Sequence, residues 1–210
     1  MKAIFKIMVL LSIMISCKDE VKEKPTEKEK AEEVKKIQRD TFSFDGEYEV
    51  NTNQVLKSEL KLKLEKLADL ENNYQVLTIR KSKFEESIVC GGIKMLPELS
   101  FERQYFEIKN LDKFQSGIGE INFAFIKGTK DLGSKTYARA QVEELIFHSE
   151  ESAQKLAGFV NEIKGKGHTW EEVDKSPNSI FYEKDKVYYI SSGGWYMKPF
   201  YQEIEKKMKK

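Results

Sequence analysis

The stretch from residue 18 to residue 40 most constrains how this chain folds, because it cannot contribute to a hydrophobic core. It carries eight basic and eight acidic side chains, and almost no apolar residue precedes Val34. Such a composition favours an extended tether, with pairs such as Glu32 and Lys36 supporting at most a solvated helix. The sequence therefore predicts a charged spacer over residues 17–40 and a globular domain over residues 41–210.

The segment before the tether has the pattern of a signal peptide. Lys2 and Lys6 supply positive charge, and a mainly apolar run follows over residues 7–15. A helix of this length spans about 14 Å, whereas the hydrocarbon core of a bilayer is about 30 Å thick. The run is therefore too short for a permanent membrane span, and it predicts a leader that is removed on export.

The apolar run ends in Met14-Ile15-Ser16-Cys17. This ending resembles the lipobox of bacterial lipoproteins, in which a small residue precedes a cysteine that receives diacylglycerol; Met14 departs from the usual Leu, Val or Ile. The resemblance implies cleavage after residue 16, lipid on Cys17 and attachment to a membrane. Two or more acyl chains suffice for stable attachment, since each buried methylene contributes about 0.8 kcal/mol.

The next residues, Lys18-Asp19-Glu20, are similar to a short signal that sends some Gram-negative lipoproteins to the outer face of the outer membrane. The resemblance implies a place in the bacterial cell envelope, at the outer membrane and exposed on the surface. A periplasm-facing anchor and a Gram-positive plasma-membrane anchor remain the alternatives.

Charge and cysteine content narrow the possible partners. With 36 basic and 35 acidic side chains the net charge is +1, whereas nucleic-acid-binding proteins carry a basic excess, so no nucleic-acid partner is expected. The chain has two cysteines, and lipidation of Cys17 leaves Cys90 without a disulfide partner. With two histidines and no cysteine pairs, no metal site and no cofactor are expected.

From Thr41 onward, strand-like and helix-like patterns alternate. Strands are expected over residues 74–80, 100–110, 120–127 and 135–147, and as a hairpin over 179–182 and 187–190. Helices are expected over residues 54–70, from the cap Ser149 to Lys164-Gly165, and from Pro199 to the end. Clustered strands with helices between them predict a single α+β domain on a largely antiparallel sheet.

Apolar spacing within these elements predicts which side chains share a face. In the first helix the expected stripe is Leu56, Leu60, Leu64, Leu67 and Ala68, with Leu62 off the stripe. In the strand over residues 120–127, Ile121, Phe123 and Phe125 are expected to share one face.

Few residues suggest catalysis. Cys90 with His148 or His168 has the composition of a thiol nucleophile and its base, but Cys90 follows apolar residues and precedes two glycines, which is typical of a small buried hydrophobe. Gly117-Ile118-Gly119 lacks the third glycine of a dinucleotide loop and precedes a strand. No catalytic residue is therefore predicted.

The stretch from Ser191 to Tyr201 concentrates aromatic residues beside flexible glycines. Trp195, Tyr196 and Tyr201 are the candidate recognition surface, because Trp and Tyr dominate binding hot spots. The alternative is that Trp195 and Phe200 dock the last helix onto the sheet.

These features together predict a non-enzymatic, lipid-anchored envelope module that binds a protein or a glycan or has a structural role. An envelope enzyme with a site built from carboxylates distant in sequence is one alternative. An anchored inhibitor or immunity protein is the other.

Overall fold

The computed structural model describes residues 40–44, 57–99, 106–166, 169–193 and 198–210, all within one compact unit, Arg39–Lys210. The leader, Cys17 and the predicted tether up to residue 39 lie outside the described residues, whereas Asp40, the last residue of that tether, is the first residue of a strand. The five-stranded sheet is formed by β2 (Tyr74–Lys81), β4 (Ile118–Asp131), β5 (Tyr137–Phe147), β7 (Lys186–Ser192) and β6 (Asn178–Glu183), in that order. Every neighbouring pair in it is antiparallel.

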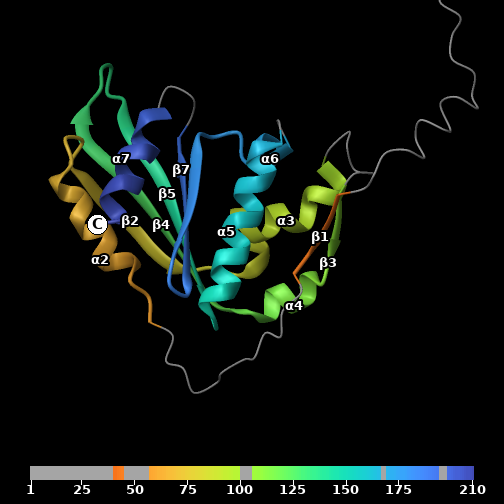
Figure 1. Cartoon of the computed structure of the whole chain (residues 1–210). Helices are drawn as coiled ribbons and strands as arrows, with labels where there is room; N and C mark the ends of the chain where they lie inside the picture. Colours follow the sequence, from red (N-terminus) through yellow and green to blue (C-terminus); the bar gives the residue numbers. More distant parts are fainter. Residues whose placement is uncertain (1–39, 45–56, 100–105, 167–168, 194–197) are drawn as a thin grey trace, which may run out of the picture. The chain divides into compact units, whose positions relative to one another are not determined.

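Helices cover both sides of this sheet (Figure 1). On one side lie α2 (Leu60–Glu65), which continues into a 3-10 turn over Lys66–Asp69, and α7 (Lys198–Met208). On the other side lie α3 (Ile88–Leu99), α5 (Glu150–Gly165) and α6 (Thr169–Val173), with α5 packed on β5, β6 and β7. The predicted α+β domain with a largely antiparallel sheet is confirmed.

Four smaller elements complete the described chain. The strands β1 (Asp40–Ser43) and β3 (Phe106–Lys109) form a separate parallel pair. The short helix α4 (Leu111–Ser116) precedes β4, and a 3-10 turn over Phe84–Glu86 precedes α3. Phe44, just after β1, stacks on Phe114 of α4 with 4.4 Å between ring centroids, which joins this pair to the core.

The core divides into two clusters because the central strands are buried on both faces. In β7, Val187 and Tyr189 pack against the cluster beneath α3 and α5, whereas Tyr188 and Ile190 pack against the cluster beneath α2 and α7. Alternating side chains point to opposite faces of a strand, so a strand covered on both sides is apolar throughout.

Two consecutive glutamates of β5 hold a helix on each face of the sheet. Glu143 accepts hydrogen bonds from Ser87 Oγ (2.8 Å) and from the backbone N–H of Ile88 (2.8 Å) and Val89 (3.4 Å), at the start of α3. Glu144 accepts from the backbone N–H of Glu59, 2.9 Å away and just before α2. The first N–H groups of a helix have no intrahelical partner, so each buried carboxylate caps a helix through a long-range contact.

Several predicted elements are confirmed. The strand over 74–80, the long strand ending at Phe147 and the hairpin of β6 and β7 all form. Ser149 caps α5, since its side chain accepts a hydrogen bond from the backbone N–H of Ser152. The apolar residues of α5 are buried on one stripe, as the spacing of three and four indicates.

The first helix is shorter than predicted. It begins at Leu60, and residues 57–59 before it are not helical. The backbone N–H of Glu59 donates to the Glu144 carboxylate, which fixes the start of the helix at this point. Leu60, Leu64 and Leu67 are buried and Leu62 is 61% exposed, as predicted, but Ala68 is exposed. Residues 54–56 of the expected helix, and residues 100–105 of the second expected strand, lie outside the described part of the chain.

The helix α3 was not predicted from the sequence, because it contains two consecutive glycines. A Cβ atom on Gly92 would lie 2.1 Å from Cγ1 of Val173 in α6. The close approach of α3 to α6 therefore requires glycine, and the tertiary contact outweighs the low helix propensity of this residue.

Candidate functional site

The residues that suggested thiol chemistry do not form a reactive site. Cys90 is fully buried in α3, and burial raises the pKa of its thiol. His148 is half-buried at the end of β5, where its backbone N–H donates to the carbonyl of Gly117. His168 lies outside the described residues. Cys90 therefore packs as a small hydrophobe in the core.

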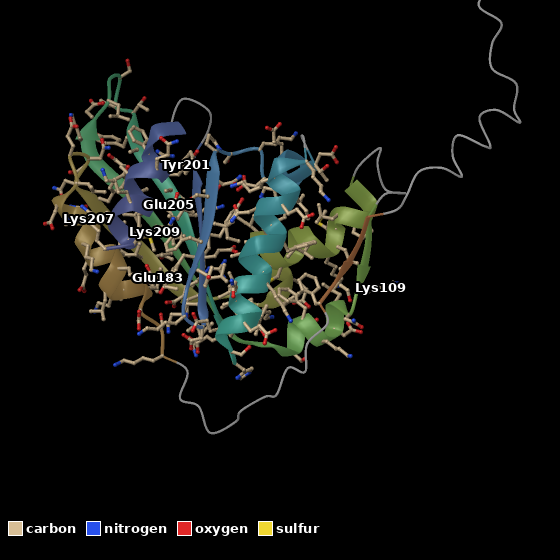
Figure 2. The ribbon with its side chains drawn as sticks, in the orientation of Figure 1. Lys109, Glu183, Tyr201, Glu205, Lys207 and Lys209 are labelled. Atoms are coloured by element: carbon tan, nitrogen blue, oxygen red, sulfur yellow. The ribbon has the colours of Figure 1, made fainter. Side chains whose placement is uncertain are left out.

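The candidate recognition residues near the C-terminus are only partly described. Trp195 and Tyr196 lie outside the described residues, as does the lipidation candidate Cys17. Tyr201, labelled on α7 in Figure 2, is half-buried against the cluster beneath α2 and α7. Its contacts with the core match the packing alternative for this stretch, and a recognition role for Trp195 and Tyr196 stays a prediction.

The part of the chain that the structure describes contains neither a metal-binding cluster nor a helix that could span a membrane. Among the residues placed by the structure, no group of three or more His, Cys, Asp or Glu side chains is arranged to hold a metal ion. None of the described helices has the length and apolar character needed to cross a bilayer.

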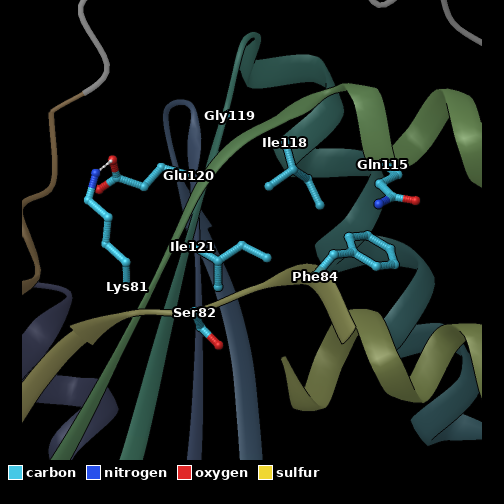
Figure 3. Close-up of a pocket in the computed structure, with 8 residues that line it drawn as sticks. All are labelled: Lys81, Ser82, Phe84, Gln115, Ile118, Gly119, Glu120 and Ile121. Atoms are coloured by element: carbon cyan, nitrogen blue, oxygen red, sulfur yellow. Dashed lines mark hydrogen bonds and ion pairs between the residues drawn. The ribbon is translucent and has the colours of Figure 1, made fainter. Parts of the chain in front are cut away.

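One pocket lies where β2 ends and β4 begins, with a volume of about 310 Å³. Figure 3 shows the ion pair of Lys81 and Glu120 at one end and Phe84 with Gln115 at the other. The Lys81 ammonium lies 2.5 Å from the Glu120 carboxylate, so each charge is balanced by the other. This pocket therefore offers no unbalanced charge with which to select a ligand.

The more distinctive surface is a part of the sheet that α3, α5 and α6 leave uncovered. Arg80 of β2 lies opposite Phe123 of β4, and Thr78 lies opposite Phe125. Phe125 in turn lies opposite Gln141 of β5, and Lys127 of β4 lies opposite Arg139 of β5, so all of these side chains share one face. We call this surface the open sheet face and define it as Thr78, Arg80, Phe123, Phe125, Lys127, Tyr137, Arg139 and Gln141.

Whether a helix packs over β4, and not the two-residue period of its sequence, decides which of its side chains are buried. Ile121, Phe123 and Phe125 do share a face, as predicted, but only Ile121 is buried. Phe123 and Phe125 are half-buried, while Ala124 and Ile126 on the opposite face are fully buried beneath α2 and α7. The shared face is confirmed, and among its three apolar residues only Ile121 is covered.

Aromatic rings and cations alternate on the open sheet face. The Arg80 guanidinium lies 5.2 Å from the centroid of the Phe123 ring, and the Lys127 ammonium lies 4.1 Å from that of Tyr137. Such cation–π contacts hold flat rings and positive charge side by side at the surface. Arg80 also pairs with the Glu86 carboxylate at 3.0 Å, so on this face the charges of Lys127 and Arg139 lie beside the apolar area of the rings.

The open sheet face deepens into a cleft of about 270 Å³. Its floor and walls are Phe125, Arg139, Ala140, Gln141, Ser176, Ser191, Ser192 and Gly193. The Oγ atom of Ser192 is buried and has no hydrogen-bond partner among the residues that the structure describes. Ser192 lies opposite Ala140, whose side chain packs beneath α2 and α7, so this hydroxyl points to that side of the sheet, and Ser191 is the β7 serine that shares the face of Gln141.

The sequence did not single out Arg139, Gln141 or Ser176, whereas Ser191 and Ser192 begin the stretch that holds the candidate recognition residues. They come from β5, β7 and the loop before β6, and only strand register brings them together. The one local signal is the alternation of Ala138, Ala140 and Val142 with Arg139 and Gln141 in β5. Comparisons of the chain with protein-family models, with curated proteins and with solved structures find no match.

Proposed function

We propose that this chain is a lipid-anchored module of the bacterial cell envelope that binds a partner through its open sheet face and catalyses no reaction. The anchor follows from the short apolar leader and the lipobox-like ending at Cys17. The spacer over residues 17–40 would hold the domain away from the membrane, because its mixed charges favour an extended, hydrated chain.

The observation that carries the binding role is the aromatic and basic character of the open sheet face. Phe123 and Phe125 remain half-buried, whereas side chains of similar size beneath the helices are fully buried. Exposed apolar area that is rimmed by polar and charged groups marks a recognition surface more often than a catalytic one. Arg139 and Lys127 add charge at one end of it.

The anchor is tested by mass spectrometry of the protein from native cells. We expect an N-terminus at Cys17 that carries acyl chains, and loss of membrane attachment in the variant Cys17→Ser. An intact leader, or an unmodified thiol at residue 17, contradicts the anchor.

The binding surface is tested by charge reversal on the full chain, immobilised and exposed to solubilised envelope material. We expect Arg139→Glu and Lys127→Glu to abolish retention that the unchanged chain shows. Lys61→Glu is the matched control, because Lys61 is exposed on α2, on the opposite side of the sheet. Equal retention by all variants would show that the open sheet face is not the binding surface.

A further inference from the structure

We infer that β2 pairs with the β2 strand of a second copy of this chain, in antiparallel orientation, with Val76 of each copy opposite Ile79 of the other. The two five-stranded sheets then form one continuous sheet across a twofold axis. This inference goes beyond the proposed binding role and does not depend on it, because it concerns the outer edge of the sheet and not its open face.

β2 is an edge strand that little else covers. In the part of the chain that the structure describes, β4 is its sole neighbour in the sheet, and seven of its eight residues are exposed. Val76 is 39% exposed, Leu77 54% and Ile79 42%. A long apolar edge with unpaired backbone groups is a template for a further strand, so natural proteins normally cover it, interrupt it or give it charge. We therefore expect this edge to have a partner strand.

The charges of β2 do not oppose such pairing. The Arg80 guanidinium lies 3.0 Å from the Glu86 carboxylate, and the Lys81 ammonium lies 2.5 Å from that of Glu120. Both cations are at the C-terminal end of the strand, and its first six residues carry no charged side chain. Each positive charge is thus balanced within its own chain, which weakens the repulsion by which charged residues keep edge strands apart.

The hydrogen bonds to β4 show which backbone groups of β2 point to the outer edge. The N–H of Ser82 donates to the carbonyl of Ile121 at 2.8 Å, in the same register as the residue pairs before it. Hydrogen-bonded and non-hydrogen-bonded pairs alternate along an antiparallel ladder. The backbone groups of Ile79 and Lys81 therefore point away from β4.

Before the bulge of β2 this alternation is shifted by one residue. The N–H of Thr129 donates to the carbonyls of Asn72 and Asn73, at 2.9 and 3.3 Å. Asn73 lies opposite Thr129 in the register that continues through Tyr74, so it is Tyr74 and Val76 whose backbone groups point away from β4.

The extra residue of the bulge, Leu77, makes the outer edge symmetric about the middle of the strand. The residues with outward backbone groups are Tyr74, Val76, Ile79 and Lys81. A regularly alternating strand that pairs on one side of the bulge is out of step on the other side, which is how bulges protect edges from unrelated strands. An antiparallel second copy carries the same shift and pairs all of these residues at once. The edge therefore fits a second copy better than an unrelated extended peptide.

Apolar side chains meet each other in this register. Val76 lies opposite Ile126 of β4, and Ile79 lies opposite Ala124, and both of these β4 residues pack beneath α2 and α7. Val76 and Ile79 thus share one face of the sheet, and the twofold axis brings each against the other in the second copy. Such apolar cross-strand pairs stabilise a sheet.

The same register keeps like charges apart. Arg80 lies opposite Gln75 of the second copy, and Lys81 lies opposite Tyr74, so no cation faces a cation across the axis. A shifted register with Ile79 opposite Lys81 would place Arg80 opposite its own copy, which is unfavourable. Charge therefore selects the register in which the two strands overlap along their whole length.

The first test is the oligomeric state of the full chain, measured by sedimentation velocity in density-matched detergent over a range of protein concentrations. An interface of one strand from each copy belongs to the small class, below about 1,200 Å², so we expect a dimer with a Kd of about 10–100 μM.

Variants of the edge locate the interface. Ile79→Lys places a charge in both apolar cross-strand pairs, and we expect it to weaken dimerisation by about tenfold or more. Ile79→Pro removes an outward N–H that the β4 ladder does not use, so the same loss is expected with the sheet intact. Met95→Lys is the matched control, because Met95 is 49% exposed on α3, outside β2, and we expect it to leave Kd unchanged. Circular dichroism verifies that each variant is folded.

Disulfide trapping tests the register. Gln75 and Arg80 of the two copies form a non-hydrogen-bonded pair with Cα atoms about 4.5 Å apart, which suits a disulfide. We expect a mixture of Gln75→Cys and Arg80→Cys to form a linked dimer on mild oxidation. Each variant alone should form little, since the two copies of residue 75 lie about 17 Å apart along the strands. The unchanged chain measures the background from its own cysteines.

A chain that is monomeric throughout the concentration range would overturn the inference. A dimer whose Kd is unchanged in Ile79→Lys, or linkage as fast in each cysteine variant alone as in the mixture, would do the same. If the chain is monomeric but Ile79→Lys abolishes retention of envelope material, β2 is the edge for a different protein, and self-pairing is wrong.

Discussion

Replacing Glu143 by Ala should be among the most damaging single changes in this domain. The side chain is 1% exposed and caps α3 across a sequence separation of more than fifty residues. Its removal leaves Ser87 Oγ and the N–H groups of Ile88 and Val89 without their acceptor. A buried donor left unpaired costs about 1–3 kcal/mol, and partial access of water to the start of α3 reduces the sum.

We therefore expect Glu143→Ala to lower the free energy of unfolding by about 3–5 kcal/mol, against a total of about 5–15 kcal/mol for a native domain. For a domain of about 150–250 residues this corresponds to a fall in Tm of roughly 6–20 °C. Urea denaturation followed by circular dichroism measures the free energy, and a thermal scan measures Tm.

Two further variants make this test specific. Glu143→Gln keeps one acceptor oxygen, and we expect it to cost at most about 2 kcal/mol. Glu65→Ala removes an exposed glutamate from α2, and we expect a change within about 0.5 kcal/mol. A loss of less than 1 kcal/mol in Glu143→Ala would refute the view that this carboxylate holds α3 on the sheet.

Three other predictions concern stability. Gly92→Ala should destabilise the fold by about 1–3 kcal/mol in urea denaturation, because the added Cβ overlaps Val173. Gly158→Ala, with open space around it in α5, should instead stabilise the fold by about 0.5–1 kcal/mol. Similar effects of the two substitutions would contradict this. Tyr189→Phe removes a hydroxyl that accepts from a tryptophan N–H at 3.2 Å and donates to a carboxylate at 2.7 Å, so a loss of about 1–3 kcal/mol is expected in the same assay. Burial raises the pKa of Glu143 above 4.5, so on raising the pH the unfolded chain loses this proton before the folded one does. The free energy of unfolding should therefore fall as pH rises from 4.5 through the folded-state pKa. Glu143→Gln should lack this dependence on pH, and an unchanged dependence in that variant would exclude Glu143 as its cause.

The local sequence pattern was sufficient to predict those elements whose caps, turns and apolar spacing all lie within the element itself. The cap Ser149 and the stripe of apolar residues after it predict α5, and two short apolar runs on either side of a charged segment predict the hairpin of β6 and β7. In these places the interactions that determine the outcome lie within a few turns or one hairpin.

Tertiary structure decided the rest, because the deciding contacts join residues far apart in the chain. The helix α3 forms around two glycines because α6 packs closely on Gly92, and its first turn is capped by Glu143 from the middle of the sheet. The two-residue alternation of side chains along a strand predicts that Phe123 and Phe125 share a face. It does not predict whether a helix covers that face. That depends on α5 packing over β5, β6 and β7, which leaves an aromatic and basic surface open on β2 and β4.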